Sequence, residues 1–171
     1  MRKNIICLLF VLCSIGISFG QNPYENYKTK WVGKPAPDFR FIDISGKEEW
    51  LSDMKGKVVL LNFWFTNCSG CRIEYPGLQT LKTRFRDASK VEFLSIATDQ
   101  KEKLMAFLQK NPLNFRHMAN AYEISEVVYG VLGYPTNIII DQEGIIRHIK
   151  IGGSPQSADD IEYEMNVLLN K

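Results

Sequence analysis

The sequence predicts an α/β sandwich in which helices flank a central mixed sheet. Residues 58–65 (VVLLNFWF) form a run that is apolar apart from Asn62 and rich in β-branched and aromatic side chains, as in a strand that is buried on both faces of a sheet. Further strand-like runs alternate with segments of helical spacing toward the C-terminus. Residues 141–144 (DQEG) mark a turn between the last two strands. This order of strands and helices is typical of an α/β fold.

The first predicted elements lie on either side of that strand. Residues 39–42 and the region near Trp50 flank residues 45–47 (SGK), which predicts an N-terminal β-hairpin with its turn at the glycine. A helix is predicted after Cys71 from the spacing of Ile73, Leu78, Leu81 and Phe85. Pro76 falls inside this helix and is expected to kink it.

The remaining predicted elements continue the alternation of strands and helices. They are a strand at 91–97, helices at 101–110 and 125–131, strands at 136–140 and 145–151, and a helix at 158–169.

The first twenty residues have the pattern of a secretory signal peptide. Arg2 and Lys3 provide a positive start, residues 5–19 are almost entirely apolar, and residues 18–20 (SFG) place small residues where a cleavage site needs them. The apolar run is shorter than the roughly 20 residues that span a bilayer. Cleavage is therefore favoured over an uncleaved inner-membrane anchor, and the protein is expected to be periplasmic or otherwise exported.

A lipoprotein signal at Cys13 is the weaker alternative, because the bulky Leu12 precedes the cysteine. Residues 21–30 are polar and without periodicity, so they are predicted to be a linker before a single domain at 31–171. Without the leader, 19 basic residues face 19 acidic ones. A chain so close to neutral is not expected to bind nucleic acid.

Two cysteines, Cys68 and Cys71, remain once the leader and its Cys7 and Cys13 are removed. An exported chain with a single pair has no disulfide framework, so the pair is free for redox chemistry. Cys68 directly follows the buried strand and is expected at a helix N-terminus, where the dipole and free N–H groups lower a thiol pKa. Cys68 is thus the expected nucleophile, and Cys71 the thiol that resolves the mixed disulfide.

Other uses of the cysteine pair fit the sequence less well. A zinc site needs about four ligands, and His117 and His148 show no ligand pattern. Haem attachment requires a histidine after the second cysteine, but Arg72 stands there. A static structural disulfide is the more serious alternative in an exported protein, although the position between strand and helix argues against it.

The chain resembles thioredoxin-fold proteins, and in particular the exported TlpA/ResA-like disulfide reductases. The resemblance extends from Gly33 to the C-terminus and implies a three-layer thioredoxin-like sandwich with an N-terminal hairpin. It rests on residues 33–39 (GKPAPDF), 55–64 (KGKVVLLNFW), 68–71 (CSGC), Pro76, 133–136 (GYPT), Gly144 and Gly152, which follow the family pattern in order.

The resemblance also implies further site residues. A glutamate at the position of Glu74 tunes cysteine protonation in this family, and its spacing of three from Cys71 places both on one helical face. A surface glutamate that favours the helix N-terminus is the open alternative. Tyr134 and Pro135 are expected to form a cis peptide bond whose backbone binds an extended substrate. Trp64 is expected to contribute to the wall of this substrate site.

Three residues or pairs depart from the family pattern. Asn67 stands where tryptophan is common before the first cysteine, and Ser69-Gly70 lacks the usual proline. Glycine is expected to loosen this turn, which leaves the reduction potential open. Asn62 occupies the position of a buried acid in cytosolic thioredoxins, which gives Glu74 more weight.

The expected function is disulfide reduction outside the cytoplasm by a monomer that needs no dissociable cofactor or metal. The resemblance implies protein disulfides as substrates, with apocytochrome c among them, and a membrane thiol reductant as electron donor. A peroxiredoxin-like peroxidase is disfavoured, because Leu61 and Phe65 stand where that chemistry needs proline and threonine. A copper-carrying or other binding module is disfavoured by the close cysteine spacing and the lack of a matched histidine.

Overall fold

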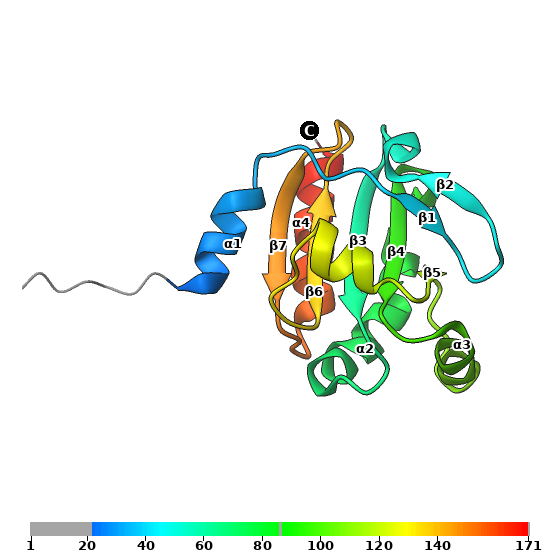
Figure 1. Cartoon of the computed structure of the whole chain (residues 1–171). Helices are drawn as coiled ribbons and strands as arrows, with labels where there is room; N and C mark the ends of the chain where they lie inside the picture. Colours follow the sequence, from blue (N-terminus) through cyan, green and yellow to red (C-terminus); the bar gives the residue numbers. More distant parts are fainter. Residues whose placement is uncertain (1–21, 86, 171) are drawn as a thin grey trace, which may run out of the picture.

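The computed structural model describes residues 22–85 and 87–170, so the predicted signal peptide at 1–20 lies outside the described residues (Figure 1). Within those two ranges, no helix combines the length and the apolar character that crossing a membrane requires. The elements, in chain order, are α1 (Pro23–Trp31), β1 (Arg40–Ile42), β2 (Glu48–Trp50), η1 (Leu51–Met54), β3 (Val58–Trp64), α2 (Ser69–Leu81), η2 (Lys82–Arg84), η3 (Ala88–Lys90), β4 (Val91–Ala97), α3 (Lys101–Lys110), β5 (Arg116–Met118), η4 (Glu123–Val128), β6 (Thr136–Ile140), β7 (Ile146–Ile151) and α4 (Ser157–Leu169).

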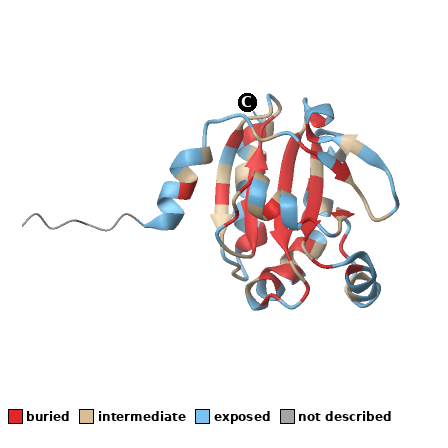
Figure 2. Ribbon diagram, in the orientation of Figure 1, coloured by how far each residue is buried: buried red, intermediate tan, exposed pale blue. Residues whose placement is uncertain are grey.

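The central sheet has the strand order β5-β4-β3-β6-β7. β3, β4 and β5 are parallel, whereas β6 is antiparallel to β3 and β7 to β6, so the sheet is mixed as predicted. β3 lies in the middle and all of its residues are buried (Figure 2), which explains why it is apolar apart from Asn62. The chain that leaves β3 toward α2 therefore emerges at the centre of one end of the sheet.

Two apolar cores cover the two faces of the sheet and confirm the layered arrangement. One core joins α2, α4 and Leu104 of α3 to β3 residues such as Leu60. The other joins the β1–β2 hairpin, η1 and Tyr129 to the alternate β3 residues, such as Leu61. Successive side chains of a strand point to opposite faces, and β3 therefore contributes to both cores.

The helices α2 and α4 pack closely and hold the start of α2 in place. A Cβ built on Gly77 of α2 would lie 2.7 Å from the Cβ of Ala158 in α4, so a larger residue does not fit between these helices. Arg84, after α2, forms ion pairs with Asp159 at 2.7 Å and Glu162 at 3.0 Å. This packing ties the helix that carries the cysteines to the C-terminal helix.

The N-terminal hairpin, β1–β2, is present and lies beside the edge strand β5 of the sheet. Its turn contains Gly46 at φ +92°, a conformation that suits glycine. The Ile44 N–H donates a hydrogen bond to the His117 carbonyl of β5 at 2.8 Å. The hairpin therefore protects an edge strand, β5, that the sequence did not predict.

The segment predicted to be a linker at 21–30 is instead the helix α1. Asn22 caps its N-terminus by accepting a hydrogen bond from the Tyr24 N–H, and Pro23 occupies the first helical position. Tyr27 is buried, and its hydroxyl donates to the Tyr129 carbonyl at 3.0 Å. The helix is stabilised by its cap and by a contact 102 residues away in sequence, not by an apolar stripe of its own.

Two other predictions differ from the structure in detail. Ile73 was placed on the buried stripe of the helix after Cys71, but it is exposed, and Glu74 occupies that stripe. The helix predicted at 125–131 is a π-helical turn, η4, that begins and ends earlier in the chain. Gly130 follows it at φ +61°, which explains why the turn does not continue.

Candidate active site

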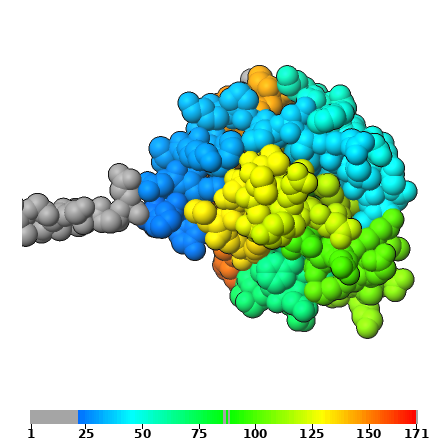
Figure 3. Space-filling model, in the orientation of Figure 1, coloured from blue at the N-terminus to red at the C-terminus, as the bar shows by residue number. Residues whose placement is uncertain are grey.

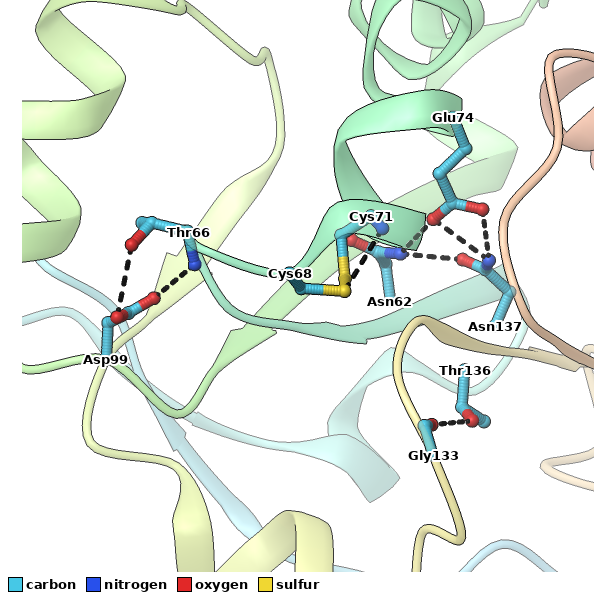
Figure 4. Close-up of a disulfide and its surroundings, with 9 residues drawn as sticks. All are labelled: Asn62, Thr66, Cys68, Cys71, Glu74, Asp99, Gly133, Thr136 and Asn137. Carbon is cyan, nitrogen blue, oxygen red and sulfur yellow. Dashed lines mark hydrogen bonds between the residues drawn. A yellow bond between two sulfur atoms is a disulfide. The ribbon is translucent and has the colours of Figure 1, made fainter.

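Cys68 and Cys71 lie where β3 passes into α2 and are joined by a disulfide (Figure 4). Cys68 is the N-cap residue of α2, and its Sγ accepts a hydrogen bond from the Cys71 backbone N–H at 3.1 Å. In the reduced protein, this N–H and the positive end of the α2 dipole stabilise a thiolate at Cys68 relative to the thiol. The predicted placement of the pair at a helix N-terminus is therefore confirmed.

The two cysteines differ only slightly in exposure. Cys68 is 5% exposed and Cys71 is 2% exposed, so Cys68 is the one nearer to solvent. Half-buried Phe65 and Tyr134 pack against the same apolar cluster as the cysteines. Their rings meet edge to face with centroids 5.4 Å apart. Phe65 and Tyr134 therefore form an aromatic pair at the edge of the cluster that contains both cysteines.

The loop before β6 lies directly against the cysteine motif. The Tyr134–Pro135 peptide bond is cis, as predicted. A Cβ built on Gly70 would lie 3.1 Å from Pro135 Cδ and 3.5 Å from the Tyr134 carbonyl oxygen. Within the described residues, the N–H and C=O of Tyr134 make no hydrogen bond. These two groups are therefore available to another chain beside the cysteines.

The segment after β7 also touches the cysteine motif through its backbone. A Cβ built on Gly153 would overlap the Gly70 carbonyl oxygen, and it would lie 2.8 Å from the carbonyl carbon and 3.3 Å from Pro135 Cγ. Glycine is thus required at this approach, because no side chain fits between the two backbones. The first turn of α2 therefore contacts the cis-proline loop on one side and the segment between β7 and α4 on the other.

Glu74 is buried at the centre of a hydrogen-bond network, so the alternative of a surface glutamate is wrong. It is 1% exposed. The Asn62 side-chain amide donates to Oε1 at 3.0 Å, and the Asn137 amide donates to Oε1 at 3.2 Å and to Oε2 at 3.0 Å. Asn62 also donates to Asn137 Oδ1 at 2.8 Å. The two asparagines are direct cross-strand partners on β3 and β6.

The environment of Glu74 shifts its ionisation toward neutral pH. Burial raises the pKa of this carboxyl from the ordinary 4.5 to about 6, because the charged form loses water. Hydrogen bonds from Asn137, Ser157 and Asn62, together with the charge of Lys150, oppose the rise. Glu74 is therefore ionised at pH 7 but titrates within reach of neutrality, one helical turn from Cys71.

A second buried carboxylate anchors the loop that leads to Cys68. Asp99 accepts hydrogen bonds from the Thr66 backbone N–H at 2.5 Å and from the Thr66 hydroxyl at 3.2 Å. It also pairs with Lys103 of α3 at 2.5 Å. These contacts hold the residue two before Cys68 against the connection between β4 and α3.

Trp64 lies in the core beneath the cysteines. It is 2% exposed, and its Nε1 donates to Ser95 Oγ at 2.6 Å. Its ring packs against Tyr75 and Phe107, each with centroids 5.5 Å away. Tyr134 is half-buried and Pro135 is buried beside the cysteine motif. Trp64 supports them from inside and offers a substrate almost no area.

The histidines are remote from the cysteine pair. His117 lies on β5 and His148 on β7, the two opposite edge strands of the sheet. His117 is buried, with Nε2 2.9 Å from the Leu113 carbonyl oxygen, and His148 lies 3.7 Å from Glu164. Over the part of the chain that the structure describes, no group of three or more His, Cys, Asp or Glu is arranged to hold a metal ion.

The sequence reasoning did not identify Asn137 or the Asp99–Thr66 contact. Asn137 is the one amide side chain in the strand Thr136–Ile140, whose last three residues are isoleucines. A buried polar side chain must find hydrogen-bond partners, so its position was a usable signal. Asp99 follows a strand end in a polar stretch, and nothing in its local sequence distinguishes it from an ordinary loop residue.

Comparison with known proteins agrees with this arrangement. The model of the AhpC/TSA family matches residues 32–149. The thioredoxin-like protein YneN of Bacillus subtilis is 34% identical over 158 residues, which cover 89% of this chain and 92% of that protein. The thiol-disulfide oxidoreductase ResA of Bacillus thuringiensis is 31% identical over 157 residues, which cover 88% of this chain and 90% of that protein.

Solved structures share the same fold. The thioredoxin domain of a thiol-disulfide oxidoreductase from Bacteroides vulgatus superposes with a TM-score of 0.67 at 29% identity, covering 79% of this chain and 98% of that domain. A thiol:disulfide interchange protein from Bacteroides sp. superposes with a TM-score of 0.66 at 28% identity, covering 79% of this chain and 90% of that protein. This chain therefore belongs to the AhpC/TSA family, has a thioredoxin-like fold and is a thiol–disulfide oxidoreductase.

Proposed function

We propose that this oxidoreductase is a protein-disulfide reductase in which Cys68 is the nucleophile and Cys71 the resolving thiol. The observation that carries the proposal is the position of Cys68 as the N-cap of α2, with its Sγ hydrogen-bonded to the Cys71 N–H. That position stabilises a thiolate at Cys68, and the thiolate is the attacking form in disulfide exchange.

The proposed cycle transfers two electrons through a mixed disulfide. The Cys68 thiolate attacks one sulfur of a substrate disulfide, the substrate S–S bond breaks, and the released substrate thiolate takes up a proton. The Cys71 thiolate then attacks Cys68 Sγ, which releases the second substrate thiolate and leaves the Cys68–Cys71 disulfide. The substrate gains two electrons and the enzyme loses two, which a dithiol donor restores by the reverse exchange.

Glu74 is proposed to accept the proton that Cys71 loses before its attack. The carboxylate is buried on the same face of α2, one turn beyond Cys71. With a pKa of about 6, it is ionised at pH 7 and is a stronger base than an ordinary glutamate, as a proton acceptor near neutral pH requires. Asn62 and Asn137 hold its two oxygens in place for this transfer.

The substrate is proposed to bind as an extended strand against Tyr134 and Pro135. The unpaired N–H and C=O of Tyr134 suit the addition of a strand, and the close approach of Gly70 places that strand beside the cysteines. Trp64 supports this wall from the core.

The proposed setting is outside the cytoplasm. Residues 1–20 are the proposed signal peptide and residues 31–171 the catalytic domain, with helix α1 between them in place of the predicted linker. A membrane thiol reductant is the proposed donor, and protein disulfides, including those of apocytochrome c in cytochrome c maturation, are the proposed substrates of a monomer.

The reduction potential of the Cys68/Cys71 pair tests the direction of electron flow. Residues 21–171 are equilibrated with thiol buffers, and tryptophan fluorescence follows the redox state. We expect a potential near or below about −220 mV, the range of pairs that are kept reduced by a donor. A value near about −120 mV is that of a strong oxidant and contradicts the proposal.

Glu74→Gln is expected to become more stable relative to the wild type as the pH rises from 4 to 7. Glu74 has a folded pKa of about 6 against an ordinary value of 4.5. Below pH 4.5 the group is protonated in both the folded and the unfolded state and does not affect stability. As the pH rises through 6, the free energy of unfolding falls by about 2 kcal/mol, because Glu74 ionises less readily in the folded state. Glutamine does not ionise, so the unfolding free energy of the variant minus that of the wild type should increase by about 2 kcal/mol between pH 4 and pH 7. Denaturant unfolding at several pH values measures it.

Glu102→Gln is the matched control, because Glu102 is exposed at the start of α3. Its difference in unfolding free energy from the wild type at each pH is the baseline against which the Glu74→Gln difference is compared. The Glu74→Gln variant should also release its mixed disulfide about tenfold more slowly at pH 7, as expected when a proton acceptor is lost. A variant that gains stability without slowing that step would show that Glu74 has no part in proton transfer.

A further inference from the structure

We infer that the first two turns of α1 and the cis-proline loop form a groove that continues the redox site. Its occupant is the segment next to the reactive cysteine in an extended polypeptide substrate, and an aromatic or large apolar side chain of that segment fits it best. This inference rests on the proposed function, because it names what the same site recognises beyond the disulfide.

The helix α1 is fixed at its C-terminal half, so its first turns project along the sheet. The Tyr27 hydroxyl donates to the Tyr129 carbonyl at 3.0 Å, and the Trp31 ring lies 6.2 Å from that of Tyr129. Just after α1, the Gly33 N–H donates to the Ile146 carbonyl at the start of β7. The N-terminal end of α1 therefore points to the end of the sheet where β7 finishes and β6 begins (Figure 1).

A hollow of about 400 Å³ separates these first turns from the cis-proline loop. Tyr24, Glu25 and Lys28 line it on the α1 side, and Gly133, Tyr134 and Gly152 line it on the other. Figure 3 shows α1 in dark blue, and the chain segment that precedes the cis-proline loop in yellow beside it. One wall of the groove is therefore formed by helix α1, which lies outside the central sheet.

Tyr134 connects this hollow to the cysteines. It lines the hollow, and its carbonyl oxygen faces Gly70 of the cysteine motif. A strand that pairs with the open N–H and C=O of Tyr134 has its reactive cysteine on one side and the hollow on the other. Its neighbouring residues therefore enter the space beside α1.

The chemistry of the groove selects the kind of side chain that enters it. Tyr24 is 46% exposed, so much of its ring is open to a partner. Glu25 and Lys28 pair with each other at 3.0 Å, so the α1 wall presents no unbalanced charge. The open Tyr24 ring beside a neutral ion pair suits an aromatic or apolar residue better than a charged one.

The composition of α1 supports a role at the surface. Tyr27 is the one buried residue of the helix, so α1 adds little to either core. A mostly polar helix that is nevertheless capped and anchored beside the redox site is positioned for contact with a partner.

The test compares Tyr24→Ala with the wild type on two disulfides. One is an oxidised peptide with an aromatic residue next to its cysteine, and the other is hydroxyethyl disulfide, which is too small to reach α1. We expect KM for the peptide to rise about fivefold, as for one lost aromatic contact, and turnover of the small disulfide to stay unchanged. Trp50→Ala is the matched control, because Trp50 is 50% exposed on the remote hairpin strand β2.

A second measurement detects occupancy of the groove directly. Cys71→Ser is trapped as a mixed disulfide with the peptide through Cys68, and the backbone amide signals of Tyr24, Glu25 and Lys28 are compared by NMR with those of the glutathione adduct. We expect these signals to shift with the peptide only.

Three outcomes overturn the inference. They are equal effects of Tyr24→Ala on both disulfides, no effect on either, and amide shifts that depend on protein concentration without peptide, which would assign the groove to a second copy of the chain. A wild type that reduces neither disulfide instead contradicts the proposed function itself, and the inference fails with it.

Discussion

Cys71→Ser is expected to stop turnover and to leave Cys68 able to attack a disulfide once. The variant retains the N-cap position of Cys68 and its hydrogen bond from the backbone N–H of residue 71, so the nucleophile keeps its stabilisation. It has no thiol to resolve the mixed disulfide, which therefore accumulates to about one per molecule. Turnover should fall by about three orders of magnitude or more, as for the loss of an essential catalytic group.

Cys68→Ser is the matched control for this prediction. Both variants lose the Cys68–Cys71 disulfide and one sulfur atom, so changes in stability common to the two are separated from changes in chemistry. We expect no adduct with Cys68→Ser, because Cys71 lies inside α2 and not at its N-cap, so its thiolate lacks the stabilisation that Cys68 has. Mass spectrometry under non-reducing conditions measures both. An adduct on Cys71 at a comparable rate would reverse the two roles.

The elements that the sequence predicted are those whose signal is local. β3 is buried on both faces, so it is apolar apart from Asn62, and the hairpin has a turn with glycine at its centre. α1 and β5 were missed because their stability comes from elsewhere in the chain. α1 depends on the contact between Tyr27 and Tyr129, and β5 is a three-residue strand, Arg116–Met118, that exists because β4 offers it an edge.

The same distinction applies to the site. The cysteine pair and the cis-proline loop follow from short motifs, so their positions were predictable. The spacing from Cys71 placed Glu74 on the right helical face, but its burial depends on Asn137, 63 residues further along the chain. The buried stripe of α2 includes Glu74, Leu78 and Leu81 at spacings of four and three, a helical period. A glutamate on the same helical stripe as Leu78 and Leu81 is therefore a sequence signal for a buried carboxylate.

The network also explains why the family resemblance and the departure at Asn62 are compatible. An acid at that position on β3 would place a second carboxylate against Glu74, because Asn62 donates directly to Glu74 Oε1 at 3.0 Å. Two buried carboxylates at such a distance disfavour double ionisation. With asparagine at both 62 and 137, Glu74 is the one carboxylate of this network, and both amides donate to it.

Gly153→Ala is expected to destabilise the protein by about 3 kcal/mol and to impair the redox site at the same time. The added Cβ overlaps the Gly70 carbonyl oxygen, and Pro135 Cγ lies 3.3 Å away on another side. Neither neighbour is the flexible tip of a side chain, so the backbone itself must move. Because Gly70 lies between Cys68 and Cys71, a shift of its carbonyl moves the first turn of α2 and the thiolate position at its N-cap.

Gly133→Ala separates this effect from the general cost of replacing a glycine near the site. A Cβ at 133 has Ile151 Cγ2 as its nearest neighbour, at 3.9 Å, an ordinary contact. Gly70→Ala should fall between the two, because its Cβ would lie 3.1 Å from Pro135 Cδ. Denaturant unfolding and the rate of Cys68 alkylation at pH 7 measure the series.

If Gly153→Ala matches Gly133→Ala in both unfolding free energy and alkylation rate, the backbone contact does not position the cysteines. If it loses both stability and thiolate reactivity, the segment after β7 is part of the redox site. That same segment leads to Ser157, which faces Glu74, so a single backbone contact would then couple the nucleophile to the buried carboxylate.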